Sequence, residues 1–138
     1  MSEEKKDCCC SRAPKLIFSC SGAADVGAIA DQAARQLTRD KTAFMCCTAA
    51  VAAGVPEIME KARAATQILV IDGCDHDCSR TVVEQGGFTG FAHVRLKDLG
   101  MQKGKTPVTD ENIATAARAC AEALARHVAD VGTGCASE

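Results

Sequence analysis

Short apolar runs alternate along the chain with segments in which apolar residues recur every three or four positions. The first pattern is typical of buried strands, and the second is typical of helices with one buried face. The first run covers residues 16–18. From Ala23 the helical period takes over, and its apolar face consists of Val26, Ile29, Ala30, Ala33 and Leu37.

The same alternation continues to the end of the sequence. A second strand is predicted over 42–47, followed by small residues up to Gly54 and a helix from Pro56 to about Ala65, since proline suits the first helical turn. A third strand is expected over 67–71 and a helix over 75–85. After a fourth strand over 91–94 and a polar loop over 97–106, Thr109 is the expected N-cap of a last helix over 112–129. Its predicted buried residues are Ile113, Ala117, Cys120, Leu124 and Val128.

This order of elements predicts an α/β fold. Strands that alternate with helices through short connections form a mostly parallel sheet covered by helices on both faces. We expect one three-layer, Rossmann-like domain of about four strands over residues 15–130. Residues 1–14 are expected to be a flexible, cysteine-rich tail, and residues 131–138 a frayed C-terminus.

Composition narrows the class of function. The net charge of −2 is small, basic residues are scattered, and the aromatic residues are four phenylalanines, so no nucleic-acid surface is expected. No apolar run approaches the length of a membrane span, and the first residues lack the apolar core of a signal peptide. A cytoplasmic protein without a membrane partner is therefore predicted.

Ten cysteines among 138 residues are too many for an ordinary cytosolic core. Three of them, Cys20, Cys47 and Cys74, follow three successive predicted strands, so they meet at one edge of the sheet, where such folds bind ligands. Cys78 lies one helical turn beyond Cys74, and a helix over 75–85 would place both sulfurs on one face. Zinc prefers four tetrahedral ligands, and thiolates are favoured at helix starts. The pattern predicts a zinc site formed by these four cysteines.

Several motifs together make the sequence resemble the DGC domain family. They are Asp72-Gly73-Cys74 with Cys78, a cysteine ending the second strand, Cys20-Ser-Gly-Ala-Ala-Asp25-Val-Gly27, and Asp98-Leu-Gly100 with Lys103-Gly104. The resemblance covers roughly residues 15–125. It implies a predicted zinc-binding domain of unassigned biochemical function, with Cys20, Cys47, Cys74 and Cys78 as the four shared cysteines.

Alternative ligands exist beside this set. Cys46 adjoins Cys47, but its side chain is expected on the other sheet face, and Cys47 fits the motif position better. His76 could replace a cysteine, although a histidine between two aspartates is more often solvated surface. Asp72 and Gly73 are expected to shape the turn. His93, His127 and Cys120 are interpreted as structural.

The role of the metal decides between functions. Four protein ligands leave no open position for a catalytic water, so a structural or metal-handling role is favoured over an enzyme, and no catalytic residue is assigned. The alternative is a thiol oxidoreductase or sulfur carrier that uses Cys74 and Cys78, with a partner protein for metal, sulfur or redox transfer. Cys8, Cys9 and Cys10 are candidate accessory thiols that would transfer metal, sulfur or electrons to the site.

A third interpretation is a phosphatase or arsenate-reductase-like enzyme. Cys74 and Arg80 have the spacing of that class, with a threonine next to the arginine. A phosphate-binding loop needs unoccupied backbone N–H groups and little negative charge, whereas this loop carries Asp75 and Asp77. The spacing is therefore interpreted as a coincidence.

Overall fold

The computed structural model describes residues 14–130, with side chains through residue 127. It contains four strands: β1 (Lys15–Ser19), β2 (Phe44–Cys46), β3 (Gln67–Asp72) and β4 (Ala92–Arg95). The described helices are α2 (Asp25–Arg39), α3 (Thr48–Ala53), α4 (Pro56–Ala64), α5 (Cys78–Gln85) and α6 (Asp110–Asp130), with a short 3-10 helix η1 (Leu96–Leu99).

The four strands form one sheet in the order β2-β1-β3-β4, and every neighbouring pair is parallel. The predicted α/β fold is thus confirmed. Because the chain first moves from β1 to β2 and later from β3 to β4 in the opposite direction, the switch in connection order lies between β1 and β3. Ligands bind at such a switch point, beside the carboxyl ends of the strands.

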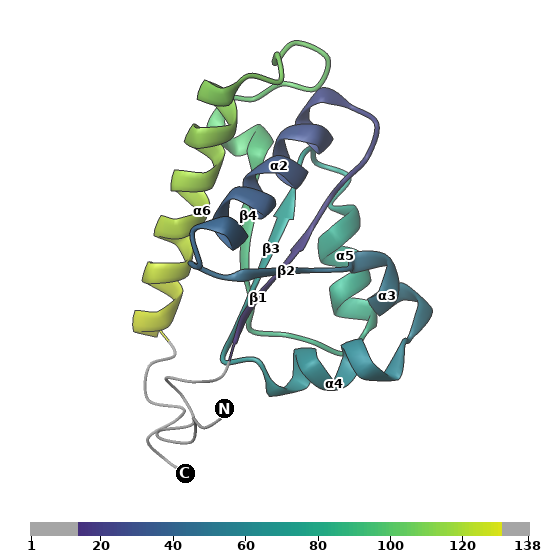
Figure 1. Cartoon of the computed structure of the whole chain (residues 1–138). Helices are drawn as coiled ribbons and strands as arrows, with labels where there is room; N and C mark the ends of the chain where they lie inside the picture. The colour runs from purple at the N-terminus through teal and green to yellow at the C-terminus, as the bar shows by residue number, and fades with distance from the viewer. Residues whose placement is uncertain (1–13, 131–138) are drawn as a thin grey trace.

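Helices cover both faces of the sheet (Figure 1). Alternate residues of the central strands face opposite sides, as the period of two in a strand requires. One core cluster joins Ile17, Leu69 and Ile71 to the apolar faces of α2 and α6. The second cluster joins residues of the intervening positions, including Phe18 and Val70, to α3, α4 and α5. All six residues of β3 are buried, as expected of a strand with a neighbour on each side and helices on both faces.

Two predictions about the connections were wrong. The small residues after Cys47 form helix α3, whose sequence is almost entirely small and apolar and so lacks the polar positions that reveal a helical period. Helix α5 begins at Cys78 rather than near Asp75, and the intervening residues form a turn in which Asp77 has a left-handed backbone (φ 53°). Cys74 and Cys78 therefore do not lie on one helix face.

The predicted start of the last helix is close to the observed one. The backbone N–H of Asn112 donates to the Thr109 hydroxyl at 3.1 Å, so Thr109 caps α6 as expected. Within the described residues, the structure contains no helix that is both long and apolar enough to cross a membrane.

Candidate metal centre

Thiols from three elements meet near the switch point between β1 and β3. Cys20 directly follows β1, Cys74 follows β3 after Gly73, and Cys78 is the first residue of α5. Cys20 remains tied to the sheet edge, because its backbone N–H donates to the carbonyl of Ile71 at 2.8 Å. The sequence prediction that strand ends bring cysteines to one edge of the sheet agrees with this arrangement.

Cys46 and Cys47 end the neighbouring strand β2. Cys46 is the last strand residue and packs against the core cluster that contains Phe18, on the α5 side of the sheet. Cys20 and Cys74 pack against the opposite cluster, which contains Ile17. Cys47 is exposed and occupies the N-cap position of α3 with an extended backbone. Cys46 therefore packs on the sheet face that was expected from the sequence. Both cysteines also line one cleft, which lies between α2, α3 and α5.

Asp72, the first residue of the Asp72-Gly73-Cys74 turn, has a structural role. The residue is 1% exposed, and its carboxylate accepts the backbone N–H groups of Ser79 at 2.8 Å and Arg80 at 3.1 Å. These N–H groups belong to the first turn of α5, where helices leave donors without an internal partner. Asp72 therefore caps α5 from the end of β3, which fixes Cys78 relative to Cys74.

His93 on β4 completes this buried cluster. Its Nε2 atom lies 2.9 Å from the Asp72 carboxylate and 3.8 Å from that of Asp77. The prediction that His93 is structural is compatible with this contact, but its connection to the cysteine turn could not be read from the sequence. The pairing of neighbouring strands β3 and β4 creates it.

Gly73 allows the turn to lie against helix α2. A Cβ atom at this position would stand 2.9 Å from the backbone carbon and oxygen of Val26. Gly27, the residue after Val26 in α2, allows a second close approach, because a Cβ atom there would lie 2.8 Å from the backbone of Gly22. Both contacts are shorter than van der Waals packing allows. These two glycines let the loops that carry Cys20 and Cys74 approach the start of α2 closely.

The other two aspartates of the turn are paired with cations. Asp77 forms a two-pronged ion pair with Arg95, which lowers the pKa of Asp77 mainly through hydrogen bonding. Asp75 accepts a bond from Lys97 at 2.6 Å, and this exposed pair lowers the pKa of Asp75. Arg95 is the last residue of the neighbouring strand β4, and Lys97 lies in η1 directly after it. The negative charge of the turn is thus compensated locally, which removes part of the cost of gathering thiolates beside it.

Asp25 attaches a further loop to this region. Its carboxylate accepts the backbone N–H groups of Gly104 at 2.9 Å and Thr106 at 3.1 Å, and these bonds hold its pKa below the usual value. The attached loop includes Lys103, whose charge lowers the pKa of Cys78 against the stronger opposing effects. The sequence motifs at Asp25 and at 103–104 are therefore two halves of one contact.

The Cys78 thiol is affected by the neighbouring thiols. Burial raises the pKa of Cys78, and negative charge on Cys20, Asp72 and Cys74 raises it further. The backbone N–H of Gly22 donates to the Cys20 sulfur at 3.5 Å, and the Cys74 sulfur lies 3.3 Å from Nδ1 of His76. The alternative ligand His76 is thus in contact with a predicted ligand.

Two groups of three candidate ligands have their ligand atoms within 4.8 Å of one another among residues 14–130. They are Cys74 with Asp75 and His76, and Asp72 with Asp77 and His93, so neither contains two cysteines. Tetrahedral zinc with Zn–S bonds of ~2.3 Å requires sulfurs roughly 3.8 Å apart. Binding of zinc by the four predicted cysteines would therefore draw their side chains closer together.

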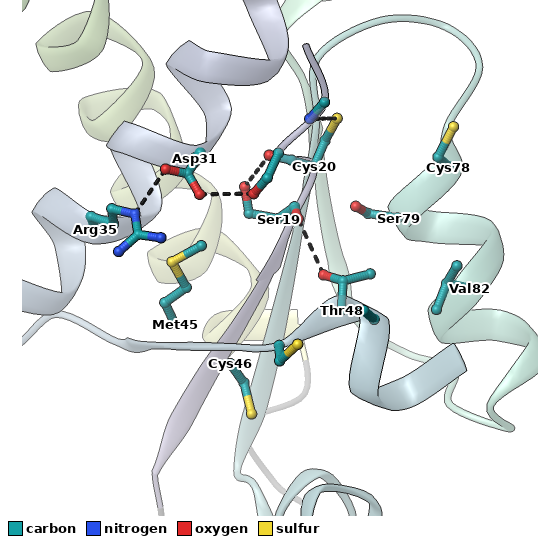
Figure 2. A pocket seen from close by; sticks show the side chains of 14 residues that line it. Ser19, Cys20, Asp31, Arg35, Met45, Cys46, Thr48, Cys78, Ser79 and Val82 are labelled. Carbon is teal, nitrogen blue, oxygen red and sulfur yellow. Dashed lines mark hydrogen bonds and ion pairs between the residues drawn. The ribbon is translucent and has the colours of Figure 1, made fainter. Parts of the chain in front are cut away.

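An open cleft of about 670 Å³ lies beside the thiols, between α2, α3 and α5 (Figure 2). Four cysteine residues line it, together with polar groups from all three helices. The cysteines are Cys20, Cys46, Cys47 and Cys78, whereas Cys74 is not among the lining residues.

The structure gives no support to the phosphatase interpretation. Such an enzyme would need the N–H groups of the first turn of α5 for its phosphate, but Asp72 already accepts two of them. The Arg80 side chain points elsewhere, since its Nε donates to Glu84 at 3.0 Å. The segment from Cys74 to Arg80 therefore offers neither vacant backbone N–H groups for an anion nor an available arginine.

The remaining cysteines fall into two groups. Cys120 is fully buried in α6, and burial raises its pKa to about 12, which agrees with the predicted core role. The suggested accessory thiols Cys8, Cys9 and Cys10, with most of the predicted tail and the C-terminal residues 131–138, lie outside the described residues. They remain sequence predictions.

Comparison with known proteins gives two matches. The family model described as "DGC domain" matches residues 16–120. A Pseudomonas aeruginosa protein described as "Anaerobic and virulence modulator AnvM" is 32% identical over 88 residues, which cover 64% of this chain and 67% of the relative. No solved structure gives a significant match.

Proposed function

The chain belongs to the DGC domain family, and from this premise we propose that it binds zinc through Cys20, Cys47, Cys74 and Cys78. The observation that supports this most is the convergence of Cys20, Cys74 and Cys78 at the switch point of the sheet, where charge on Cys20 and Cys74 raises the pKa of Cys78. Thiolates are strong zinc ligands, and a set of four satisfies the coordination of the ion.

The surroundings of the thiols fit this proposal. The carboxylates of the turn are each occupied, Asp72 by backbone N–H groups, Asp75 by Lys97 and Asp77 by Arg95. A four-thiolate zinc site carries a formal charge of −2, so cations near it reduce the electrostatic cost of binding. The sulfurs have weaker partners: Cys20 accepts the Gly22 N–H at 3.5 Å, and Cys74 lies 3.3 Å from Nδ1 of His76.

A metal-handling role suits the geometry better than a purely structural one. Strands β1 and β3 and helix α5 are held by hydrogen bonds and core packing that do not depend on the metal. The thiols border an open cleft rather than the buried core. The description of the relative as a modulator, rather than an enzyme, is compatible with a non-catalytic role.

Metal analysis of the full-length protein, paired with a count of free thiols, tests the proposal. We expect about one equivalent of zinc, and less than half an equivalent after Cys74→Ser or Cys78→Ser. The matched control changes Cys8, Cys9 and Cys10 to serine together and should keep the wild-type content. Unchanged zinc in Cys74→Ser, or less than half an equivalent in wild-type protein with intact thiols, would overturn it.

A thiol oxidoreductase or sulfur carrier is the second candidate, favoured by the contact between the Cys74 sulfur and His76 at 3.3 Å. Cys78 is less suited to the attacking role, because its raised pKa reduces the thiolate fraction at neutral pH. Alkylation of metal-free protein tests this candidate. A thiol at Cys74 that reacts no faster than that of exposed Cys47 would count against it.

A further inference from the structure

The cleft beside the thiols has the size of a small-molecule site. Its volume of about 670 Å³ falls within the range of roughly 300–1,000 Å³ that is usual for such sites. It opens at the carboxyl ends of β1 and β2, and its walls come from α2, α3 and α5. Ligand binding at this edge of the sheet is expected from the fold. The proposed zinc site, however, does not require a cleft of this volume.

One hydroxyl that lines the cleft has no protein partner. Ser79 contributes to the lining, and its hydroxyl takes part in no hydrogen bond within the described part of the chain. Figure 2 shows this hydroxyl directed from α5 into the cleft, toward the loop that carries Cys20. The neighbouring Thr48 hydroxyl is satisfied, because it donates to the Ser19 carbonyl at 3.1 Å. A hydroxyl that faces the cleft without a protein partner can donate a hydrogen bond to a ligand or accept one from it.

A cation lies at the other end of the cleft. Nε of Arg35 donates to Asp31 at 2.8 Å, while the two terminal amino groups of this guanidinium donate to no group in residues 14–130. Asp31 holds the arginine in place and also accepts a bond from the Ser21 hydroxyl at 2.7 Å. The free edge of a guanidinium binds a carboxylate through two parallel hydrogen bonds.

The space between these two ends has a mixed lining. Four thiols border it, and Met45, Ala49 and Val82 provide apolar surface. Figure 2 shows Cys78 and Ser79 on α5 across from Cys20, with Arg35 and Met45 on the far side. A ligand that fits would combine a carboxylate for Arg35, an apolar stem and a hydrogen-bonding group near Ser79.

We propose that the cleft binds a low-molecular-weight thiol that carries a carboxylate, of the cysteine and glutathione class. Its carboxylate would pair with Arg35, and its sulfur would lie beside the protein thiols. There the ligand sulfur can compete with a protein thiol for the proposed zinc ion. The sulfur end of the proposal rests on the proposed zinc binding, whereas the carboxylate end rests on Arg35 and Ser79 alone.

Calorimetric titration of full-length protein with reduced glutathione, under argon and without other thiols or carboxylates, tests this inference. Arg35→Gln should weaken binding by about tenfold or more, since it removes a charge-assisted bidentate contact. Arg39→Gln, on the same helix but outside the lining of the cleft, is the matched control and should bind like wild type. The Arg35 and Asp31 pair is a surface pair, so its loss costs little stability.

S-methylglutathione separates the two ends of the ligand. It should bind the zinc-containing protein several-fold more weakly than glutathione, and this difference should vanish when zinc is removed. Equal binding of glutathione by Arg35→Gln and wild-type protein would overturn the inference. Equal binding of the two compounds by zinc-containing protein would overturn its thiol part. Absence of zinc from wild-type protein would instead refute the proposed function, because the Arg35 comparison does not depend on metal.

Discussion

The carboxylate of Asp72, at the end of β3, accepts the backbone N–H of Ser79 at 2.8 Å and so caps the helix that starts at Cys78. The strand and the helix are thereby locked at the turn that carries Cys74. The same carboxylate accepts a second backbone bond from Arg80 and contacts His93, so one buried side chain organises the turn.

Replacement of Asp72 should destabilise the protein measurably. Asp72→Ala removes two hydrogen bonds to the start of α5 and leaves buried N–H groups unpaired, which we expect to cost roughly 2–3 kcal/mol. Asp72→Asn keeps one acceptor oxygen and should cost less. Urea unfolding followed by circular dichroism measures both, with exposed Asp40→Asn as a near-neutral control. Equal stability of Asp72→Ala and wild type would refute the capping role.

Gly73 should tolerate no side chain. Gly73→Ala would place a Cβ atom 2.9 Å from the Val26 backbone, and we expect a loss of about 1–3 kcal/mol as α2 and the turn move apart. Gly22→Ala is the matched control, because its Cβ would meet only the Cys20 sulfur at an ordinary 3.7 Å. Thermal unfolding of the two variants provides the comparison. A smaller loss for Gly73→Ala than for Gly22→Ala would contradict the close approach.

The two cysteines at the end of β2 should differ in their effect on zinc. Cys47 is exposed at the start of α3, whereas Cys46 packs against the core on the other face of the sheet. We therefore expect Cys47→Ser to lower the zinc content below half an equivalent and Cys46→Ser to leave it unchanged. Metal analysis of both variants decides the assignment, and the opposite result would make Cys46 the ligand.

The contact between Asp25 and the loop at 104–106 should depend on pH. Hydrogen bonds from Gly104 and Thr106 lower the pKa of Asp25 in the folded state. A lowered folded pKa adds stability that is fully present above the unfolded pKa of about 3.9 and is lost as the pH falls through the folded value. Wild type should thus exceed Asp25→Asn in stability at pH 6, and the difference should shrink toward pH 3. Unfolding free energies at the two pH values measure this, and a difference that grows on acidification would refute it.

Much of the fold follows from local pattern. The period of apolar residues identified all four strands and the long helices, because burial of alternate strand residues and of one helix face leaves a direct trace in the sequence. Helix α3 was not predicted, because its six small residues show no periodic alternation of apolar and polar positions. The start of α5 was misplaced because its cap, Asp72, lies six residues before Cys78 and belongs to the preceding strand, so no neighbouring cap residue marks it.

By itself the sequence determined which residues lie at the strand ends, and hence that Cys20, Cys47 and Cys74 approach one edge of a parallel sheet. Tertiary structure alone decided what surrounds them. The contacts of Asp72 with His93, Asp77 with Arg95, and Asp25 with Gly104 join segments 18 to 79 residues apart. Such partners are brought together by strand order and helix packing, which local periodicity does not encode. The free Ser79 hydroxyl and the cleft that it faces arise in the same way.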